Sequence, residues 1–409
     1  MAKEYKDLVV GLDIGTAKVM VVVAEVLPGG ELKLAGLGLA PSNGLKRGVV
    51  VNIDATVQSI QQALKEAELM ADCKITRVYT GITGSHIRGF NSSGMVAIKD
   101  REVSAADVAR VLETAKAINI STDQRLLLVE PQEFVIDGQD VKEPIGMSGI
   151  RLEAKVHIVT GAQSAAENII KCVRRCGLEV EQLMLNPLAS SLSVLTEDER
   201  ELGVALVDIG AGTTDVAIFT NGAIRHTSVI PIAGDLITSD IAMALRTPTK
   251  DAEDIKVESG YAKQLLADPD SQVEVPGLGD RGPRMLSRQA LAGVIEPRVE
   301  EIFSLVHQVM RESGFEEMLS SGIVLTGGSC IMPGMVELGE DIFLKPVRRG
   351  IPKYSGALSD MVAQPRAATV MGLLEEARLA RLRGFKVAQK GGSMKAAFSQ
   401  VKDWFVGNF

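Results

Sequence analysis

A short pattern of strand and glycine turn occurs twice in the chain, once near its start and once near its middle. Residues 8–16 read LVVGLDIGT and residues 203–215 read GVALVDIGAGTTD. In both places an apolar, β-branched run typical of a buried strand ends in Asp-Ile-Gly and then Thr. A second apolar run follows each turn, over residues 18–26 and 215–230. We therefore expect two strand–turn–strand units, and this duplication indicates two related lobes that face each other.

The residues of the two turns have the chemistry of a phosphate site. Glycine lets the backbone approach a ligand closely, and successive N–H groups at such turns form a concave site for phosphate oxygens. Asp13 and Asp208 end the two strands, where carboxylates are placed to hold Mg²⁺ through its waters. The predicted contacts are Asp13, Gly15, Thr16, Lys18, Asp208, Gly210, Gly212, Thr213 and Thr214. A single turn of this kind can be purely structural, and for Asp13 alone the alternative is a plain turn residue. Two copies of the turn favour a clamp for a polyphosphate.

A third glycine turn lies within residues 322–335, which read GIVLTGGSCIMPGM. The pattern predicts a strand, then Gly327 and Gly328, then a helix that starts near Ser329. Adjacent glycines remove side chains where a flat ring or a ribose could lie against the backbone. The alternative for this segment is a plain strand-to-helix turn.

Two further short segments fit an anion site. Gly234 and Asp235 stand at an expected helix start, where free N–H groups favour anions. Glu253 and Lys256 are three residues apart, so they lie on one face of a predicted helix. For this second pair, an exposed ion pair is the alternative.

Length, charge and cysteine content limit the class of protein. A chain of 409 residues is too long for one core, so we expect two or more domains. The net charge of −8 argues against a body that binds nucleic acid. The four cysteines lack zinc-site spacing, and we expect buried reduced thiols, with Cys172 and Cys176 on one helix. With no apolar core of a signal peptide and no run long enough to span a membrane, a cytosolic protein is expected.

Residues 394–409 combine scarce aromatic side chains with a helical pattern, and they contain the only tryptophan of the chain. Written as a helix, their apolar residues recur at steps of three and four and form one face. These residues are Met394, Ala397, Phe398, Val401, Trp404, Phe405 and Phe409. Such a helix is too short to span a bilayer but suits its surface, and the basic run at 378–390 would add attraction to anionic lipid. The alternative is that the helix docks on the protein's own body or in a partner's groove.

These motifs carry a resemblance to a known family. DIGT at Asp13, DIGAGTTD at Asp208 and LTGGSCIMPG at Leu325 resemble the phosphate-1, phosphate-2 and adenosine motifs of the actin–hexokinase–heat-shock-chaperone superfamily. Within it, the chain is similar to the FtsA family of bacterial cell-division actin homologues over nearly all of residues 5–409. The segments TGITGSHIRGFNSSGMVAI, TEDERELGVALVDIGAGTTD and KAAFSQVKDWFVGNF carry this closer likeness.

The resemblance implies an α/β fold of two RNase-H-like lobes that enclose ATP and Mg²⁺, with an α+β subdomain inserted in the first lobe and a C-terminal amphipathic helix. The implied units are a first-lobe core at 1–84 and 161–190, completed by 364–385; the insert at 85–160; a second-lobe core at 191–235 and 306–363; a small subdomain at 236–305; a linker at 386–393; and the membrane-targeting helix at 394–409. The sequence of the insert agrees, because it predicts a helix over 103–118 with Ser104 as N-cap near Asp107, and strands over 126–138 and 151–159.

The resemblance also implies an ATP site with little or no hydrolysis. By motif match, the nucleotide contacts are those of the two turns together with Gly234, Glu253, Lys256, Gly327 and Gly328. Hydrolysis of the actin type needs a side chain that orients the attacking water near the first link between the lobes. That link, LMLNPLASSL at 183–192, offers Asn186 and Pro187 but no carboxylate or glutamine.

The implied role is a scaffold on the cytoplasmic face of the inner membrane that self-assembles, tethers the tubulin-like division protein FtsZ and recruits later division proteins through the insert. The FtsZ C-terminal peptide would bind the small subdomain, where Arg288 and Arg298 are the predicted charge partners; solvated surface arginines are the alternative. The membrane contacts would be Met394, Phe398, Val401, Trp404, Phe405 and Phe409. The alternatives are a small-molecule kinase of the same superfamily or another actin-like scaffold, such as MreB or a pilus-assembly ATP-binder. No nucleic-acid partner is expected.

Overall fold

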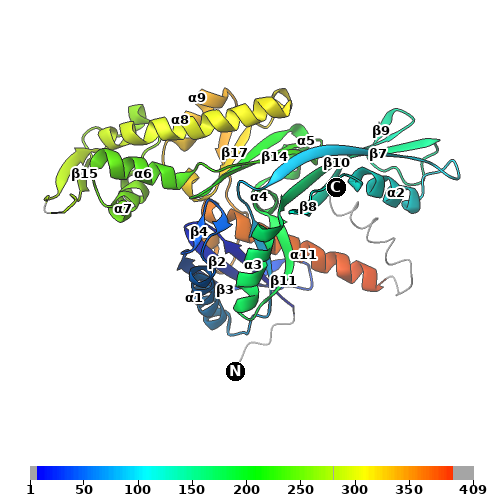
Figure 1. Cartoon of the computed structure of the whole chain (residues 1–409), viewed down its shortest axis with the longest axis horizontal. Helices are drawn as coiled ribbons and strands as arrows, with labels where there is room; N and C mark the ends of the chain where they lie inside the picture. The colour runs from blue at the N-terminus through cyan, green and yellow to red at the C-terminus, as the bar shows by residue number, and fades with distance from the viewer. Residues whose placement is uncertain (1–6, 280, 390–409) are drawn as a thin grey trace.

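The computed structural model describes residues 7–279 and 281–389, with side chains described up to residue 384. Two five-stranded sheets form the cores of two lobes (Figure 1). The first sheet has the order β11-β6-β1-β2-β3. Its strands are β1 (Leu8–Ile14), β2 (Lys18–Val26), β3 (Leu32–Pro41), β6 (Arg77–Ile82) and β11 (Glu179–Leu185). The central β1 pairs antiparallel with β2 and parallel with β6.

The second sheet repeats this topology, which confirms the two related lobes expected from the duplicated turn. Its order is β14-β13-β12-β17-β18. The strands are β12 (Val204–Ile209), β13 (Thr214–Thr220), β14 (Ala223–Ile230), β17 (Ile323–Thr326) and β18 (Val347–Arg349). Here β12 pairs antiparallel with β13 and parallel with β17, as β1 does with β2 and β6. β12 and β17 are buried along their whole length, as expected for strands covered on both faces.

One part of the strand prediction was wrong. The segment 215–230 was expected to continue as one run after the second glycine turn, but it forms two strands, β13 and β14, joined by a hairpin. Asn221 and Gly222 form the turn with φ of 53° and 76°. Both values are positive, as a two-residue hairpin turn requires, and Asn-Gly is the pair that such a turn favours.

Helices cover the first-lobe sheet and link it to the second lobe. They are α1 (Ile53–Ala71), α3 (Gln163–Arg175), α4 (Asn186–Val194) and α11 (Ala368–Gln389). α1 packs on β3 at very close range, because a Cβ on Gly38 would lie only 1.8 Å from the Ala63 carbonyl oxygen. α11 packs against α4 and β1. The chain passes between the two lobes near α4 and again near α11, and these two helices therefore lie in contact.

The second lobe continues into a small subdomain built mainly from helices. Its elements are α6 (Gly234–Leu245), α7 (Thr249–Ser259), η1 (Gln264–Leu266), β15 (Gln272–Val275) and β16 (Arg284–Ser287). The long α8 (Arg288–Ser313) runs unbroken from this subdomain into the second-lobe core, so the boundary expected at 305–306 falls inside a helix. There Phe303 is fully buried and its ring lies 5.1 Å from that of Phe343.

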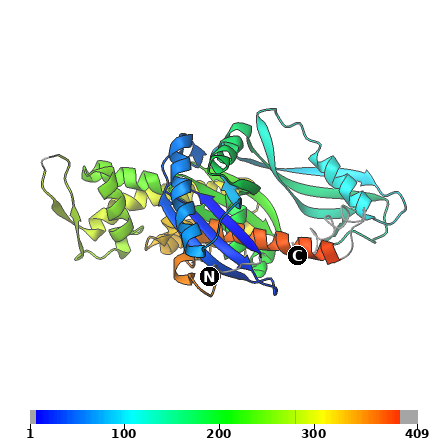
Figure 2. The ribbon, with the colours of Figure 1, turned by 90° about the horizontal axis from the view of Figure 1, so that it is seen from below.

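The inserted subdomain is a separate α+β unit. Its sheet has the order β7-β10-β8-β9, with β7 (Arg88–Ala97), β8 (Gln124–Ile136), β9 (Gln139–Val141) and β10 (Arg151–Ala162). Helix α2 (Ala105–Lys116) packs on β7 and β10. Ser104 and Asp107 form the reciprocal capping box expected at its start. Figures 1 and 2 show this subdomain at the opposite end of the molecule from the small subdomain of the second lobe.

The remaining elements are short, apart from α9. They are β4 (Leu45–Lys46), β5 (Val49–Val50), α5 (Glu197–Leu202), η2 (Glu316–Met318), η3 (Gly328–Ile331), α9 (Met335–Phe343), α10 (Ser359–Val362) and η4 (Pro365–Ala367). All four cysteines are free; Cys172 and Cys330 are buried, and Cys73 and Cys176 are half-buried. α3 ends at Arg175, so Cys176 caps that helix instead of lying within it. Among the residues described, no helix combines the length and apolarity needed to cross a membrane.

Candidate nucleotide site

The first glycine turn places a carboxylate and an ammonium group together. Asp13 lies near the end of β1 and is 7% exposed, while Lys18 begins β2. The Lys18 Nζ atom lies 3.3 Å from the Asp13 Oδ2 atom. The turn is closed by a hydrogen bond of 2.9 Å from the Gly15 amide to the Lys18 carbonyl. Its shape is therefore set locally, by the strand ends and the glycine.

The second turn has the same construction. The Gly210 amide donates to the Thr213 carbonyl at 2.9 Å, matching the bond of the first turn. Asp208, also 7% exposed, accepts hydrogen bonds from the Ser190 hydroxyl at 2.6 Å and from the Thr369 hydroxyl at 3.4 Å. Burial raises the pKa of Asp208 to about 6, and the charge of Asp13 adds to that rise.

The two turns meet across the lobes. A Cβ on Gly212 would lie 2.6 Å from the Thr16 Oγ1 atom and 2.9 Å from the Arg47 Cα atom, both in the first lobe. Close by, Thr83 at the end of the first-lobe strand β6 donates a hydrogen bond to Asp215 of the second lobe. Burial, followed by the charge of Asp208, raises the pKa of Asp215 to about 7. The structure thus gathers buried carboxylates where the turns face each other.

The third glycine turn joins the same place. Gly327 has φ of +87°, and a Cβ there would lie 2.5 Å from the Asp208 Oδ1 atom. Gly234, at the start of α6, donates its amide to the Gly210 carbonyl at 3.2 Å. The Ser329 hydroxyl donates to the same carbonyl at 2.7 Å. The second glycine turn, the third glycine turn and the start of α6 therefore lie in contact, and a Cβ on Gly328 would make an ordinary van der Waals contact of 3.8 Å with the Arg366 Cβ atom.

The pair on α7 is more buried than an exposed ion pair. Lys256 is 9% exposed, and its Nζ atom lies 2.6 Å from the Glu253 Oε2 atom. The same Nζ donates to the Thr238 hydroxyl at 2.8 Å and to the Gly234 carbonyl at 3.2 Å. Glu253 and Lys256 thus brace the start of α6, next to the phosphate turns.

Four polar residues near the meeting turns were missing from the sequence prediction: Thr83, Ser190, Asp215 and Thr369. Asp215 had a signal, because it closes the quoted motif DIGAGTTD. The other three lie on β6, α4 and α11 or their ends, and only the fold brings them to the aspartates. At the expected water-orienting position, the Asn186 Oδ1 atom is buried without a hydrogen-bond partner among the described atoms.

The predicted peptide-binding arginines already have partners. The Arg288 Nε atom donates to the Ser259 carbonyl at 2.9 Å, and its guanidinium lies 5.4 Å from the centre of the Tyr261 ring. Arg298 binds both carboxylate oxygens of Asp240, at 2.5 and 3.0 Å. Both arginines lie on α8, as expected, but neither has a solvated, unpaired head group.

The residues predicted to contact a membrane lie outside the described part of the chain. The basic run before them is described only in part, as the end of α11. There Arg378, Arg381 and Arg383 form ion pairs with Glu375, Asp7 and Glu376, with N–O distances of 2.7, 3.3 and 2.6 Å. Each of these three arginines is therefore paired with a carboxylate of the protein's own body, and the attraction of the run to anionic lipid stays a prediction.

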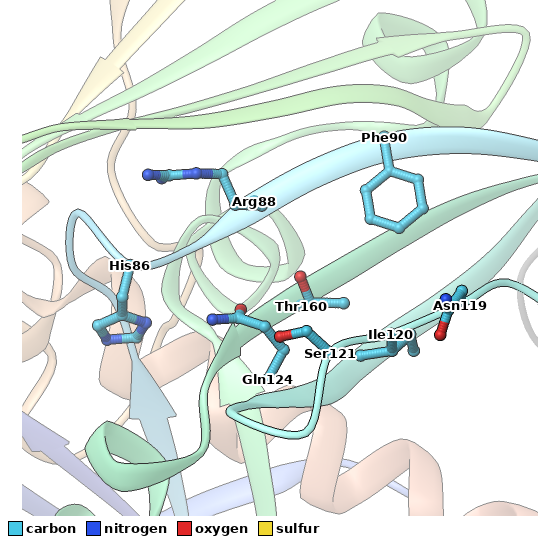
Figure 3. Close-up of a pocket in the computed structure, with 8 residues that line it drawn as sticks. All are labelled: His86, Arg88, Phe90, Asn119, Ile120, Ser121, Gln124 and Thr160. Atoms are coloured by element: carbon cyan, nitrogen blue, oxygen red, sulfur yellow. The ribbon is translucent and has the colours of Figure 1, made fainter.

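A separate cavity of about 340 Å³ lies at the root of the inserted subdomain (Figure 3). Its lining includes His86 before β7, Arg88 and Phe90 on β7, Gln124 on β8 and Thr160 on β10. None of the predicted nucleotide contacts lines it. The candidate phosphate site is instead the contact zone of the glycine turns.

The residues present fit a magnesium nucleotide. Glycines let the three turns come close together, and hydroxyl, ammonium and amide donors surround the place where the turns meet. Within residues 7–279 and 281–389, no cluster of three His, Cys, Asp or Glu side chains could hold a metal ion by itself. A magnesium ion near Asp13 and Asp208 would therefore complete its shell with water and phosphate oxygens, as Mg²⁺ commonly does.

Comparison with known proteins agrees with this architecture. The family model described as "Cell division protein FtsA" matches residues 205–372, and that described as "SHS2 domain inserted in FTSA" matches residues 84–160, the expected insert. The chain is 55% identical to "Cell division protein FtsA" of Pseudomonas aeruginosa, covering 98% of both chains. It is 51% identical to the protein of the same description from Neisseria meningitidis, covering 97% of this chain and 98% of the relative.

Solved structures with far lower sequence identity share the fold. The "PilM-PilN type IV pilus biogenesis complex" matches with a TM-score of 0.63 at 18% identity, covering 90% of this chain and 98% of that one. MreB 5 of Spiroplasma citri bound to AMPPNP matches with a TM-score of 0.58 at 16% identity, covering 95% and 100%. The "MamK double helical filament" gives 0.51 at 13% identity, covering 90% and 98%. With its duplicated sheets, its inserted subdomain and these relatives, the chain has the actin-like fold and belongs to the FtsA family of cell division proteins.

Proposed function

We propose that this protein is an ATP-binding, actin-like scaffold of cell division that tethers FtsZ to the cytoplasmic face of the inner membrane. The observation that carries the nucleotide part is the contact between the two phosphate turns. Thr16, from one lobe, lies 2.6 Å from where a Cβ on Gly212 of the other lobe would stand. Two glycine turns that meet face to face, with Gly327 beside them, form a clamp suited to a polyphosphate.

Each part of the clamp has a distinct role in this proposal. The backbone amides of the two turns, with Thr16 and Thr213, would bind phosphate oxygens, and Lys18 would add positive charge. Asp13 and Asp208 would orient the waters of Mg²⁺, which would neutralise part of the phosphate charge. The Gly327–Gly328 turn, which carries no side chain, would receive the nucleoside. These roles require only that ATP binds. We propose that ATP is hydrolysed slowly or not at all.

A kinase of the same superfamily is the alternative from a different class. It would need a pocket for an acceptor molecule beside the phosphate clamp, with a base to activate the acceptor. ATP-dependent phosphorylation of a small metabolite at a substantial rate would overturn the scaffold proposal. Release of inorganic phosphate at a low rate would agree with it.

The membrane part of the proposal rests on the amphipathic pattern of residues 394–409. The test is co-sedimentation with anionic liposomes, with and without ATP and Mg²⁺, for the full chain and for a chain ending at Lys390. We expect only the full chain to pellet with lipid. If both chains stay in the supernatant, the helix is not an anchor and a docking groove becomes the better explanation.

A pair of substitutions sharpens this test. Trp404→Glu puts a charge on the apolar face and should release the full chain from liposomes, because burying a large apolar side chain contributes about 1.5–3 kcal/mol. Gln400→Glu adds the same charge off that face and should bind lipid nearly as well as the unchanged protein. Equal binding by both variants would contradict the assigned face.

The FtsZ part concerns the small subdomain. We propose that the FtsZ C-terminal peptide binds there, with Arg288 and Arg298 as charge partners. Because Asp240 holds Arg298, the peptide would have to share or displace that carboxylate, so Arg288 is the stronger of the two. Self-assembly and recruitment of later division proteins through the insert complete the proposed role.

A further inference from the structure

A small cationic hairpin stands between the third strand of the first lobe and α1. Strands β4 and β5 pair Leu45 with Val50 and Lys46 with Val49. The turn between them consists of Arg47 and Gly48, whose φ angles are +50° and +76°, the signs that a tight two-residue hairpin requires. The Gly44 carbonyl holds the base by accepting the amide of Val51 at 2.8 Å. The tip is therefore a defined structure.

The tip of this hairpin touches both phosphate turns at once. The Gly48 amide donates to the Thr16 hydroxyl of the first turn at 3.1 Å. A Cβ on Gly48 would lie 3.0 Å from the Cγ2 atom of Thr83. On the other lobe, a Cβ on Gly212 would lie 2.9 Å from the Arg47 Cα atom and 3.0 Å from its backbone nitrogen. Arg47 thus stands where the two lobes close on each other.

The charges of the site explain why a cation is needed there. Asp13, Asp208 and Asp215 are all buried near the meeting point of the turns, and the one lysine of the turns, Lys18, lies beside Asp13. A triphosphate that enters such a site meets carboxylates, so its charge must be offset by further cations. Arg47 is exposed and, among the described residues, no ion pair or side-chain hydrogen bond occupies its guanidinium.

We propose that Arg47 binds the terminal phosphate of a nucleoside triphosphate and that the tip of the hairpin, Arg47 and Gly48, forms a third wall of the phosphate site. This inference rests on the nucleotide binding proposed above. A guanidinium can make two parallel hydrogen bonds to a phosphate, and its charge is permanent. Because the hairpin borders the meeting point of the turns, Arg47 would distinguish a triphosphate from a diphosphate. Lys46 is on the same hairpin but makes none of these contacts with the second turn, so it serves as the matched control.

The experiment compares the full chain with Arg47→Gln, Arg47→Lys and Lys46→Gln. Affinities for ATP, ADP and AMP are measured by calorimetry in the presence of Mg²⁺. We expect Arg47→Gln to bind ATP at least about tenfold more weakly, since a hydrogen bond to a charged group is commonly worth one to two factors of ten. The affinity for ADP should fall less than that for ATP, and the affinity for AMP should not change. Arg47→Lys should recover part of the loss, and Lys46→Gln should match the unchanged protein.

Three outcomes would overturn the inference. One is unchanged ATP affinity in Arg47→Gln. The second is an equal loss for ATP, ADP and AMP, which would indicate a distorted site. The third is a loss in Lys46→Gln as large as in Arg47→Gln, which would indicate unspecific attraction. Failure of the proposed function itself looks different, because the unchanged protein would then bind no nucleotide. Thermal unfolding without nucleotide confirms that each variant is folded.

Discussion

Gly212 is the residue at which the closeness of the two lobes can be tested most directly. Its φ is not in the left-handed region, so alanine would fit the local backbone, and only neighbours oppose it. A Cβ there would lie 2.6 Å from Thr16 Oγ1 and 2.9 Å from Arg47 Cα, whereas ordinary contacts begin near 3.4 Å. In Gly212→Ala the turns must therefore move apart by about 0.5–0.8 Å.

This separation should lower the affinity for nucleotide more than it lowers the free energy of unfolding. Overpacking of this kind commonly costs about 1–3 kcal/mol. Without nucleotide, the lobes can relieve it by opening slightly, so the free energy of unfolding should change little. A nucleotide that bridges both turns needs them close, so we expect ATP affinity to fall about 5- to 150-fold, the equivalent of that energy.

The assay is a calorimetric ATP titration of Gly212→Ala with a urea unfolding curve. Gly29→Ala is the matched control, because a Cβ on Gly29 meets no atom within 4 Å. Unchanged ATP affinity in Gly212→Ala would refute the reasoning, because it would show that binding does not need the turns this close.

Two further predictions concern buried polar groups. The pKa of Asp215 is raised to about 7, above that of an unfolded aspartate, so its ionised form disfavours folding and the free energy of unfolding should rise as pH falls from 8 to 6. Asp215→Asn should reduce this rise in urea unfolding at the two pH values, leaving the part due to Asp208, and an unaltered rise would contradict the assignment. Thr227→Val leaves buried His157 without the hydrogen bond of 2.9 Å to its Nε2 atom and should lower the free energy of unfolding by about 1–3 kcal/mol. Substitution of the exposed Thr249 by Val should change it by less than about 0.5 kcal/mol. Equal effects would argue against a stabilising contact between His157 on β10 of the insert and Thr227 on β14 of the second lobe.

Much of the architecture could be predicted because its signals are local. A β-branched run that ends in Asp-Ile-Gly specifies a strand and a turn over a few residues, and both copies form as expected. The capping box of Ser104 and Asp107 is likewise complete within one helical turn. The hairpin at Asn221 and Gly222 also has a local signal, the Asn-Gly pair, although the apolar run around it predicts a single strand.

The candidate site was predictable only in its glycine turns. These turns recur as motifs, so their residues were identified, and the fold brings them together. Thr83, Ser190 and Thr369 carry no motif, because an isolated hydroxyl on a strand or helix has no pattern in sequence. The ion pair of Arg298 with Asp240 could not be predicted either, since Asp240 lies on another helix and meets Arg298 only in the folded small subdomain.

The sequence by itself determined the two lobes, the insert and the three glycine turns, because hydrophobic periodicity and turn chemistry act over short stretches of chain. Only the tertiary structure decided which groups face each other across the lobes. Arg47 against Gly212, Thr83 against Asp215 and His157 against Thr227 each join residues far apart in the chain. Such contacts depend on how two packed sheets close on one another, and no short segment encodes that closure.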